Sequence, residues 1–220
     1  MGNFVDGLLQ GAGYSWKWET KLPLFAAEVF LVLSMLLLCF FIQTNFPQDL
    51  EAQKLVTIFS SFLLIGLVIH LATKLAVAEH TGFGSGEKSV LALIMGFGVA
   101  FFLVFVKLSV APLAIAGDAV FWTVLVAGIA ETYFFQNTLV PTISELTNST
   151  VFGLFWGNLA FGLFHFFVTG GNPFGILTVF LFGLIMSLGN GVLKTTLFSY
   201  SLHIGNNAFF LLKQSLGLFA

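Results

Sequence analysis

The sequence predicts an all-α protein, a polytopic transmembrane helical bundle of about seven spans that forms a single transmembrane domain over residues 1–220. Charged residues make up 8% of the chain and hydrophobic residues make up 58%, whereas a soluble domain carries roughly 25% charged residues. The apolar residues also fall into runs of about 20, which is the length that an α-helix needs to cross a bilayer. The chain is therefore expected to be an integral, multi-pass membrane protein that has the lipid bilayer as a partner.

Seven apolar runs are predicted to be membrane spans, and polar or Gly- and Pro-containing turns separate them. Asp118 is expected to cap the fourth span at its N-terminus, and Pro141 lies near the end of that span. The Gly189-Asn190-Gly191 run could end the sixth span early. Residues 1–22, with Trp16 and Trp18, are predicted to form an interfacial N-terminal segment on the membrane surface. The predicted spans cover residues 24–43, 55–78, 89–108, 119–143, 150–169, 174–193 and 195–213.

Composition also excludes or disfavours several classes of function. The formal net charge is −2 and Arg is absent, so the chain has no basic patch that would bind nucleic acid. The single cysteine, Cys39, cannot form an internal disulfide and is interpreted as a small packing residue. A transporter or proton relay is disfavoured, because the sequence has neither an inverted repeat nor charged groups that extend through both leaflets.

Glu131 lies near the middle of the fourth predicted span, where an ionised and unpaired carboxylate would cost several kcal/mol. Its predicted partners lie on two other spans. His165 and Asn158 are seven residues apart on the fifth span, and His203 and Asn207 are four residues apart on the seventh. From the helical rise, Glu131 lies roughly 18–20 Å into the bilayer, and the other side chains could lie in the same half or near the middle. These groups could therefore line one cavity.

From the residues alone, this cavity could be a hydrolytic site or a polar network that only fixes helix packing. Glu131 could act as a general base on a water molecule. The two imidazoles could hold that water or bind a metal, and Asn207 could donate a hydrogen bond to an oxyanion. Interhelical hydrogen bonds between polar side chains would equally explain these residue types in a membrane bundle.

Three motifs on three predicted spans resemble those of the CPBP family, which contains the CAAX prenyl protease-type and bacteriocin-processing intramembrane proteases. The family pattern is Glu-Glu-x-x-x-Arg, then Phe-x-x-x-His, then His-x-x-x-Asn or Asp, with each motif on its own transmembrane helix. The order and the spacing of the motifs match over a CPBP-like core of residues 118–213. The motifs in this chain are Glu131-Thr132-Tyr133-Phe134-Phe135-Gln136, Phe161-x-x-x-His165 and His203-x-x-x-Asn207.

The resemblance implies an intramembrane endopeptidase that cleaves a peptide bond in a membrane-embedded or lipidated substrate, such as a prenylated peptide. It implies that Glu131 activates the water and that His165, His203 and Asn207 complete the catalytic site. The cofactor is predicted to be either none or a divalent metal such as zinc. Glu131, His165 and His203 could bind zinc, but a ligand role for Glu131 would leave no evident base, so the balance lies slightly towards none.

Two positions depart from the family pattern, since Thr132 replaces the second Glu and Gln136 replaces the Arg. Positions four apart share a helical face, so a hydroxyl–amide pair is expected here in place of an acid–base pair. Thr132, Gln136 and Asn158 are therefore predicted to be supporting residues. The exchange could preserve the geometry of an active hydrolase at lower desolvation cost. Alternatively, it marks a divergent, catalytically inactive protein that acts as a subunit or scaffold with partner membrane subunits.

Overall fold

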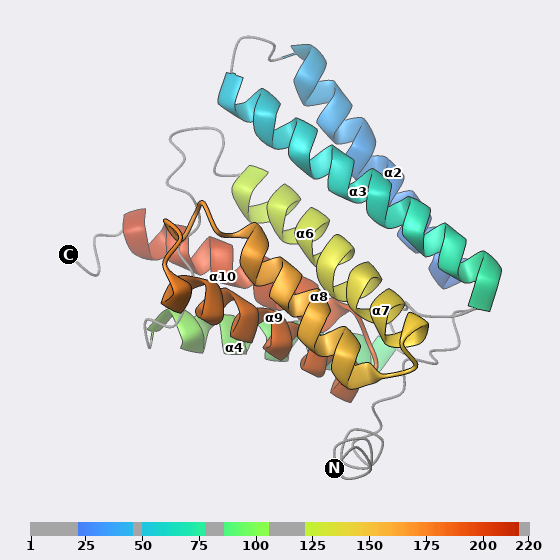
Figure 1. Cartoon of the computed structure of the whole chain (residues 1–220). Coiled ribbons are helices and arrows are strands. Elements are labelled where there is room, and N and C mark those ends of the chain that lie inside the picture. The colour runs from blue at the N-terminus through green and yellow to red at the C-terminus, as the bar shows by residue number, and fades with distance from the viewer. Residues whose placement is uncertain (1–21, 46–49, 78–85, 106–121, 216–220) are drawn as a thin grey trace.

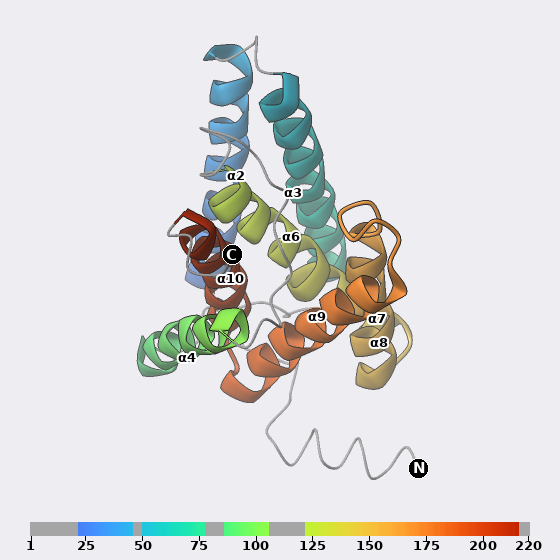
Figure 2. The same cartoon turned by 90° about the vertical axis from the view of Figure 1, so that its left-hand side faces the viewer.

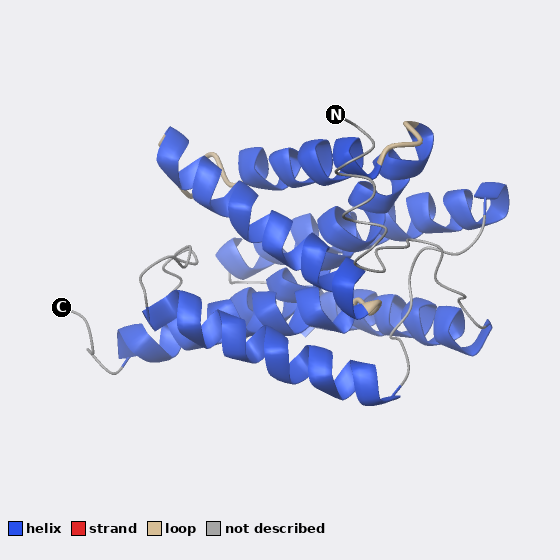
Figure 3. Cartoon of the chain, turned by 90° about the horizontal axis from the view of Figure 1, so that it is seen from below, coloured by secondary structure: helices blue, strands red, loops and turns tan. Residues whose placement is uncertain are grey.

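A computed structural model describes residues 22–45, 50–77, 86–105 and 122–215, and these ranges are helical apart from short turns and contain no strand (Figure 3). The prediction of an all-α fold is confirmed. The Asp118 cap and residues 1–21 of the predicted interfacial segment lie outside the described residues. The elements are α2 (Leu22–Asn45), α3 (Leu50–Val77), α4 (Gly86–Phe105), η1 (Trp122–Ala127), α6 (Gly128–Phe134), η2 (Phe135–Leu139), α7 (Val140–Leu146), α8 (Thr150–Phe164), α9 (Pro173–Leu193) and α10 (Leu197–Ser215).

The helical run from η1 to α7 occupies the middle of the bundle (Figures 1 and 2). On one side of it lie α2 and α3, which pack against each other, and α3 also contacts α6. On the other side, α10 contacts α6, α9 and α4, while α8 packs between α7 and α9. The run that carries Glu131 is therefore surrounded by α3, α8 and α10, the last two of which carry the other predicted site residues.

Small residues allow the helices to approach one another closely. A Cβ atom added at Gly96 of α4 would overlap Ser201 Oγ of α10 and lie 2.8 Å from the Phe198 carbonyl oxygen. A Cβ atom at Gly157 of α8 would lie 3.0 Å from the Val140 Cα atom of α7. Glycine at such contacts is typical of membrane helices, because packing replaces the hydrophobic driving force that water supplies elsewhere.

The outer faces of α2 and α3 carry large apolar side chains. Phe30, Leu37 and Phe40 of α2 are 73%, 68% and 64% exposed, and Val68 of α3 is 58% exposed. A water-soluble protein seldom exposes a continuous apolar surface of this kind. These faces suit contact with lipid chains.

Two of the described helices are long and apolar enough to cross a membrane, namely Gln53–Leu71 and Pro173–Leu193. Val32–Asn45, Ser89–Val104 and Thr150–Phe164 are apolar but shorter. The number of about seven spans therefore stays a prediction. The predicted fourth and seventh spans are the run from η1 to α7 and α10, and buried polar side chains interrupt the apolar character of both.

Two helix ends differ from those considered from the sequence. The fifth helix was expected to reach residue 169, but α8 ends at Phe164, and residues 165–171 form turns in which Gly170 and Gly171 have φ values of 61° and 70°. Glycine adopts such positive φ values without steric strain. In contrast, α9 does not end at the Gly189-Asn190-Gly191 run, because it continues to Leu193 and ends at Lys194, which has a φ of 55°.

Candidate active site

The helical run that carries Glu131 is not a regular α-helix, because π-helical segments precede and follow α6. In η2, the backbone N–H of Val140 donates to the carbonyl of Phe135, five residues earlier. Pro141 follows directly. Proline has no N–H to donate, and its ring crowds the carbonyl four residues before it, which here belongs to Asn137. The proline therefore gives a local physical reason for the wider turn that precedes it.

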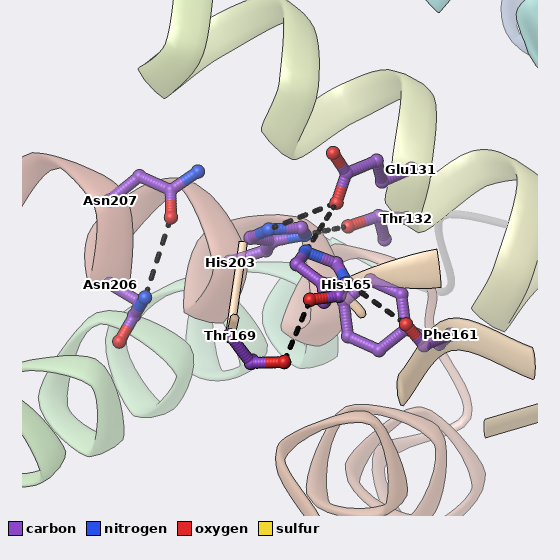
Figure 4. A network of polar contacts seen from close by, with 8 residues as sticks. All are labelled: Glu131, Thr132, Phe161, His165, Thr169, His203, Asn206 and Asn207. Carbon is purple, nitrogen blue, oxygen red and sulfur yellow. Dashed lines mark hydrogen bonds and ion pairs between the residues drawn. The ribbon is translucent and has the colours of Figure 1, made fainter. Parts of the chain in front are cut away.

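Three of the four predicted catalytic side chains converge between α6, the end of α8 and α10 (Figure 4). Glu131 Oε2 lies 3.4 Å from His165 Nε2 and 3.9 Å from His203 Nε2. The side chains of Glu131, His165 and His203 are 8%, 14% and 6% exposed. Among the described side chains that are buried, Glu131 is the only Asp, Glu or Lys. A buried carboxylate without a partner is strongly destabilising, so this contact with two imidazoles explains how the fold tolerates it.

His165 is held by its own helix at the point where α8 ends. Its Nδ1 atom lies 2.9 Å from the carbonyl oxygen of Phe161. A carbonyl can only accept a hydrogen bond, so Nδ1 carries the proton and Nε2 of a neutral ring faces Glu131 with its lone pair. An ionised carboxylate would also present only acceptors there. The pair can therefore make contact only through a proton on one of the two groups or through a donor between them.

His203 is oriented by Thr132, whose Oγ1 atom lies 2.9 Å from His203 Nδ1. Thr132 is fully buried, and His203 is 5% exposed. The rings of Phe161 and Phe182 pack edge-on against the imidazole, with centroids 5.8 Å away in each case. The hydroxyl and the two rings together direct His203 Nε2 towards Glu131.

The expected pair between Thr132 and Gln136 is wrong. The partner of Thr132 is His203, and Gln136 Nε2 instead donates to Asn158 Oδ1 of α8 at 3.2 Å. The reason is the π-helical turn, because Gln136 lies inside η2 and the rule that positions four apart share a face applies to a regular α-helix. Thr132 thus supports the cluster directly, while Gln136 and Asn158 lie in a separate network.

Asn207, the fourth predicted catalytic residue, lies one turn beyond His203 on α10 and is 6% exposed. Its Oδ1 atom lies 3.4 Å from Asn206 Nδ2. In Figure 4 it stands to one side of the close contact between Glu131 and the imidazoles. The structure therefore brings together Glu131, His165 and His203, with Asn207 at the edge of the cluster.

A second set of buried polar side chains joins η2 to its neighbours, and sequence reasoning named Gln136 and Asn158 of this set but missed its other members. Asn190 Nδ2 of α9 donates to Asn137 Oδ1 at 2.8 Å and to Ser199 Oγ of α10 at 2.9 Å. Ser187 Oγ of α9 donates to Asn158 Oδ1 at 3.2 Å. The signal was the polar run Gln136-Asn137-Thr138 inside an apolar stretch, where polar groups need buried partners.

The described residues contain no group of three or more His, Cys, Asp or Glu side chains arranged to hold a metal ion. Glu131, His165 and His203 are the donors predicted for zinc, and the predicted choice between no cofactor and a divalent metal stays a prediction. No step of the reaction considered below depends on a metal.

The fold and the site together define an all-α protein with membrane-type helix packing and a buried Glu–His–His cluster. Residues 118–209 match the model of the Rce1-like family, described as type II CAAX prenyl endopeptidase Rce1-like. The resemblance to the CPBP family is thereby confirmed for this part of the chain, which contains all three motifs. No curated protein and no solved structure matches the chain.

Proposed function

We propose that this protein is an intramembrane endopeptidase of the CPBP type, with several membrane spans, that hydrolyses a peptide bond in a membrane-embedded or lipidated peptide. One observation carries the proposal: Glu131 Oε2 lies within 3.4 and 3.9 Å of two imidazole nitrogens in a buried setting. The three residues come from motifs that the Rce1-like family match spans. A buried carboxylate next to two ring nitrogens has the composition of a general acid–base site.

In this reaction Glu131 accepts a proton from a water molecule, and the resulting hydroxide attacks the carbonyl carbon of the scissile peptide bond. The tetrahedral intermediate collapses when the C–N bond breaks, and Glu131 returns its proton to the leaving amine. His165 Nε2 faces Glu131 and assists this transfer, because it can hold the same proton. The products are a new carboxyl group and a new amine, so atoms and charge balance.

The oxyanion of the intermediate needs a donor, and His203 and Asn207 are the candidates. His203 Nε2 can donate when Thr132 donates to Nδ1, because a neutral imidazole has one donor and one acceptor. Asn207 directs its amide oxygen at Asn206, so its Nδ2 group is the end that faces away from that residue (Figure 4). Both residues lie on one face of α10, four positions apart.

We propose that this reaction needs no metal. Glu131 is the acidic side chain of the cluster, and a carboxylate that binds zinc cannot act as the base at the same time.

A second candidate function follows from the altered first motif. Thr132 and Gln136 remove the acid–base pair that the family carries, and Gln136 Oε1 is buried without a hydrogen-bond partner. A protein that had lost its chemistry could retain the fold as a subunit or scaffold of a larger membrane complex. Purification in mild detergent distinguishes this candidate, since it requires stable co-purifying membrane subunits and no proteolysis.

The experiment that tests the proposed function is hydrolysis by protein reconstituted in liposomes. A panel of prenylated, otherwise lipidated and transmembrane peptides is incubated in H₂¹⁸O, and the products are analysed by mass spectrometry. We expect one bond to be cleaved, with ¹⁸O in the new carboxyl group. The matched control is a Glu131→Gln preparation, which separates this protein from a contaminating protease. Cleavage that is equal in both preparations would contradict the proposal.

A further inference from the structure

Three consecutive buried side chains in η2 make polar contacts in different directions. Gln136 Nε2 donates to Asn158 Oδ1 at 3.2 Å, and Asn137 Oδ1 accepts from Asn190 Nδ2 at 2.8 Å. Thr138 Oγ1 donates to the carbonyl oxygen of Tyr133, five residues earlier, at 2.8 Å. All three side chains are at most 3% exposed. We call Gln136, Asn137 and Thr138 the polar bracket.

The partners of the polar bracket are themselves fixed to their helices. Asn158 Nδ2 donates to the Leu154 carbonyl oxygen of α8 at 2.8 Å and to Ser187 Oγ of α9 at 3.1 Å. Asn190 Oδ1 accepts from the backbone N–H of Ser199 in α10 at 3.0 Å. The bracket therefore attaches one turn of the central run to α8, α9 and α10. In apolar surroundings such bonds are directional, because an alternative register would leave buried polar groups without partners.

The position of this turn matters because the segments on both sides of it are packed tightly. After the turn, Val140 of α7 contacts Gly157 of α8 so closely that a Cβ atom added at Gly157 would overlap Val140 Cγ2 and lie 3.0 Å from Val140 Cα. Before the turn, Gly128 of α6 packs on Ile204 of α10, where an added Cβ atom would lie 2.9 Å from a side-chain carbon. A π-helical turn holds more residues than an α-helical turn. It therefore sets the rotation of α6 relative to α7.

We propose that the polar bracket consists of positioning residues that hold the π-helical turn of η2 and thereby aim Glu131 and Thr132 at His165 and His203. If the turn relaxed to a regular α-helix, one residue would leave it, and the direction of the side chains of α6 relative to α8 would change. The distances within the cluster of Glu131, His165 and His203 depend on this direction. The expected effect on hydrolysis rests, in addition, on the proposed function. Thr138 supports the turn locally, because its hydroxyl provides a partner for a backbone carbonyl where the α-helical ladder is interrupted.

The test compares two substitutions at one position of the bracket. Asn137→Leu removes the acceptor for Asn190 Nδ2, whereas Asn137→Asp, as the neutral acid, keeps an acceptor oxygen in nearly the same place. Ser144→Ala is the matched control, because Ser144 is a buried polar residue of the same helical run whose hydroxyl donates to the Val140 carbonyl in its own helix. All three variants are prepared as the full chain in the same detergent.

Two readouts separate positioning from a general loss of fold. The first is the set of imidazole ¹⁵N signals of His165 and His203 in histidine-labelled protein, assigned with His→Gln variants. The second is peptide hydrolysis, with kcat and KM measured separately. For Asn137→Leu we expect both imidazole signals to shift and kcat to fall by about 10²-fold, as a misplacement of about 1 Å can cause. We expect KM to stay within a factor of about three, because substrate binding elsewhere is unchanged.

Asn137→Asp is expected to restore the wild-type signals and most of kcat, and Ser144→Ala is expected to change neither readout. The proposal is overturned if Asn137→Leu remains folded with unchanged imidazole signals, or if Asn137→Asp is as impaired as Asn137→Leu. If Asn137→Leu does not fold, the milder Gln136→Met variant replaces it, because Asn158 Oδ1 still accepts from Ser187. The proposal is then overturned if Gln136→Met remains folded and its imidazole signals are those of the wild type. Because the imidazole signals need no activity, a failure of the proposed function leaves this test valid.

Discussion

The contact between Thr132 and His203 makes Thr132→Val the most informative single substitution in the first motif. Valine has the shape of threonine, so it removes the hydroxyl while it preserves the volume in a fully buried position. The change removes the 2.9 Å contact to His203 Nδ1. It leaves the contact between Glu131 and His165 in place. Thr132→Ser is the conservative variant, because it retains the hydroxyl.

The expected magnitude follows from the burial of both partners. A buried donor or acceptor that loses its partner typically costs about 1–3 kcal/mol, and a change of 1 kcal/mol shifts the melting temperature of a protein of this size by about 2–4 °C. Thr132→Val should therefore lower the apparent melting temperature by about 2–12 °C. It should also lower kcat by roughly tenfold or more, because His203 Nε2 is no longer aimed at the reacting groups.

The assay is thermal unfolding in one detergent at one scan rate, together with hydrolysis of the best peptide from the liposome panel. A fixed scan rate is needed because unfolding of membrane proteins is often irreversible. Thr178→Val is the matched control, since the Thr178 hydroxyl donates to the Phe174 carbonyl in its own helix and lies far from any motif in the sequence. It should change stability and activity little.

The reasoning is refuted if Thr132→Val and Thr132→Ser have the same stability and the same kcat. That result would mean that the hydroxyl does not orient His203. A further contrary result would be a loss as large in Thr178→Val as in Thr132→Val, because the effect would then come from the threonine-to-valine change itself.

Three further predictions concern packing, the second imidazole and metals. Gly96→Ala should destabilise the protein by about 1–3 kcal/mol, because the added methyl group overlaps Ser201 Oγ. Gly98→Ala on the same helix, which has nothing within 4 Å, should be neutral or slightly stabilising, and equal melting temperatures for the two variants would contradict this account of the interface. His165→Gln should lower kcat by about 10²-fold in protein that remains folded, and retention of activity would remove His165 from the mechanism. A metal chelator should leave the rate of hydrolysis unchanged, whereas a loss that added zinc restores would establish a metal requirement.

The helical fold was predictable from hydropathy, whereas helical rise allowed Glu131, His165 and His203 to line one cavity without requiring them to meet. Apolar runs predict helices, and the depth of each polar residue along its helix limits which side chains can meet. The joining of the three residues in one site was an implication of the resemblance to the CPBP family. Asn207 is four residues from His203 and therefore lies on the same face of the helix. This spacing does not fix the distance between Asn207 and Glu131.

The partners of Thr132 and Gln136 were not predictable from spacing, because the rule of four holds only for a regular α-helix. Pro141 was placed near the end of the fourth predicted span. The five-residue π-helix that lies just before this proline was not predicted. The early end of α8 was also missed. Gly170-Gly171 marked the break, yet the turns already begin at His165, which places that imidazole at the end of a helix.

The central claim is that Glu131 activates the water that cleaves the peptide bond. Its most direct test is the rate of hydrolysis by Glu131→Gln relative to the wild type, in the same liposomes and at equal amounts of folded protein. Glutamine keeps the size of the side chain and cannot accept the proton. The proposal predicts a rate lower by about 10²–10⁴-fold, which is the usual contribution of a positioned general base, with an intact helical fold. A Glu131→Gln protein that cleaves the same bond at the wild-type rate would contradict it.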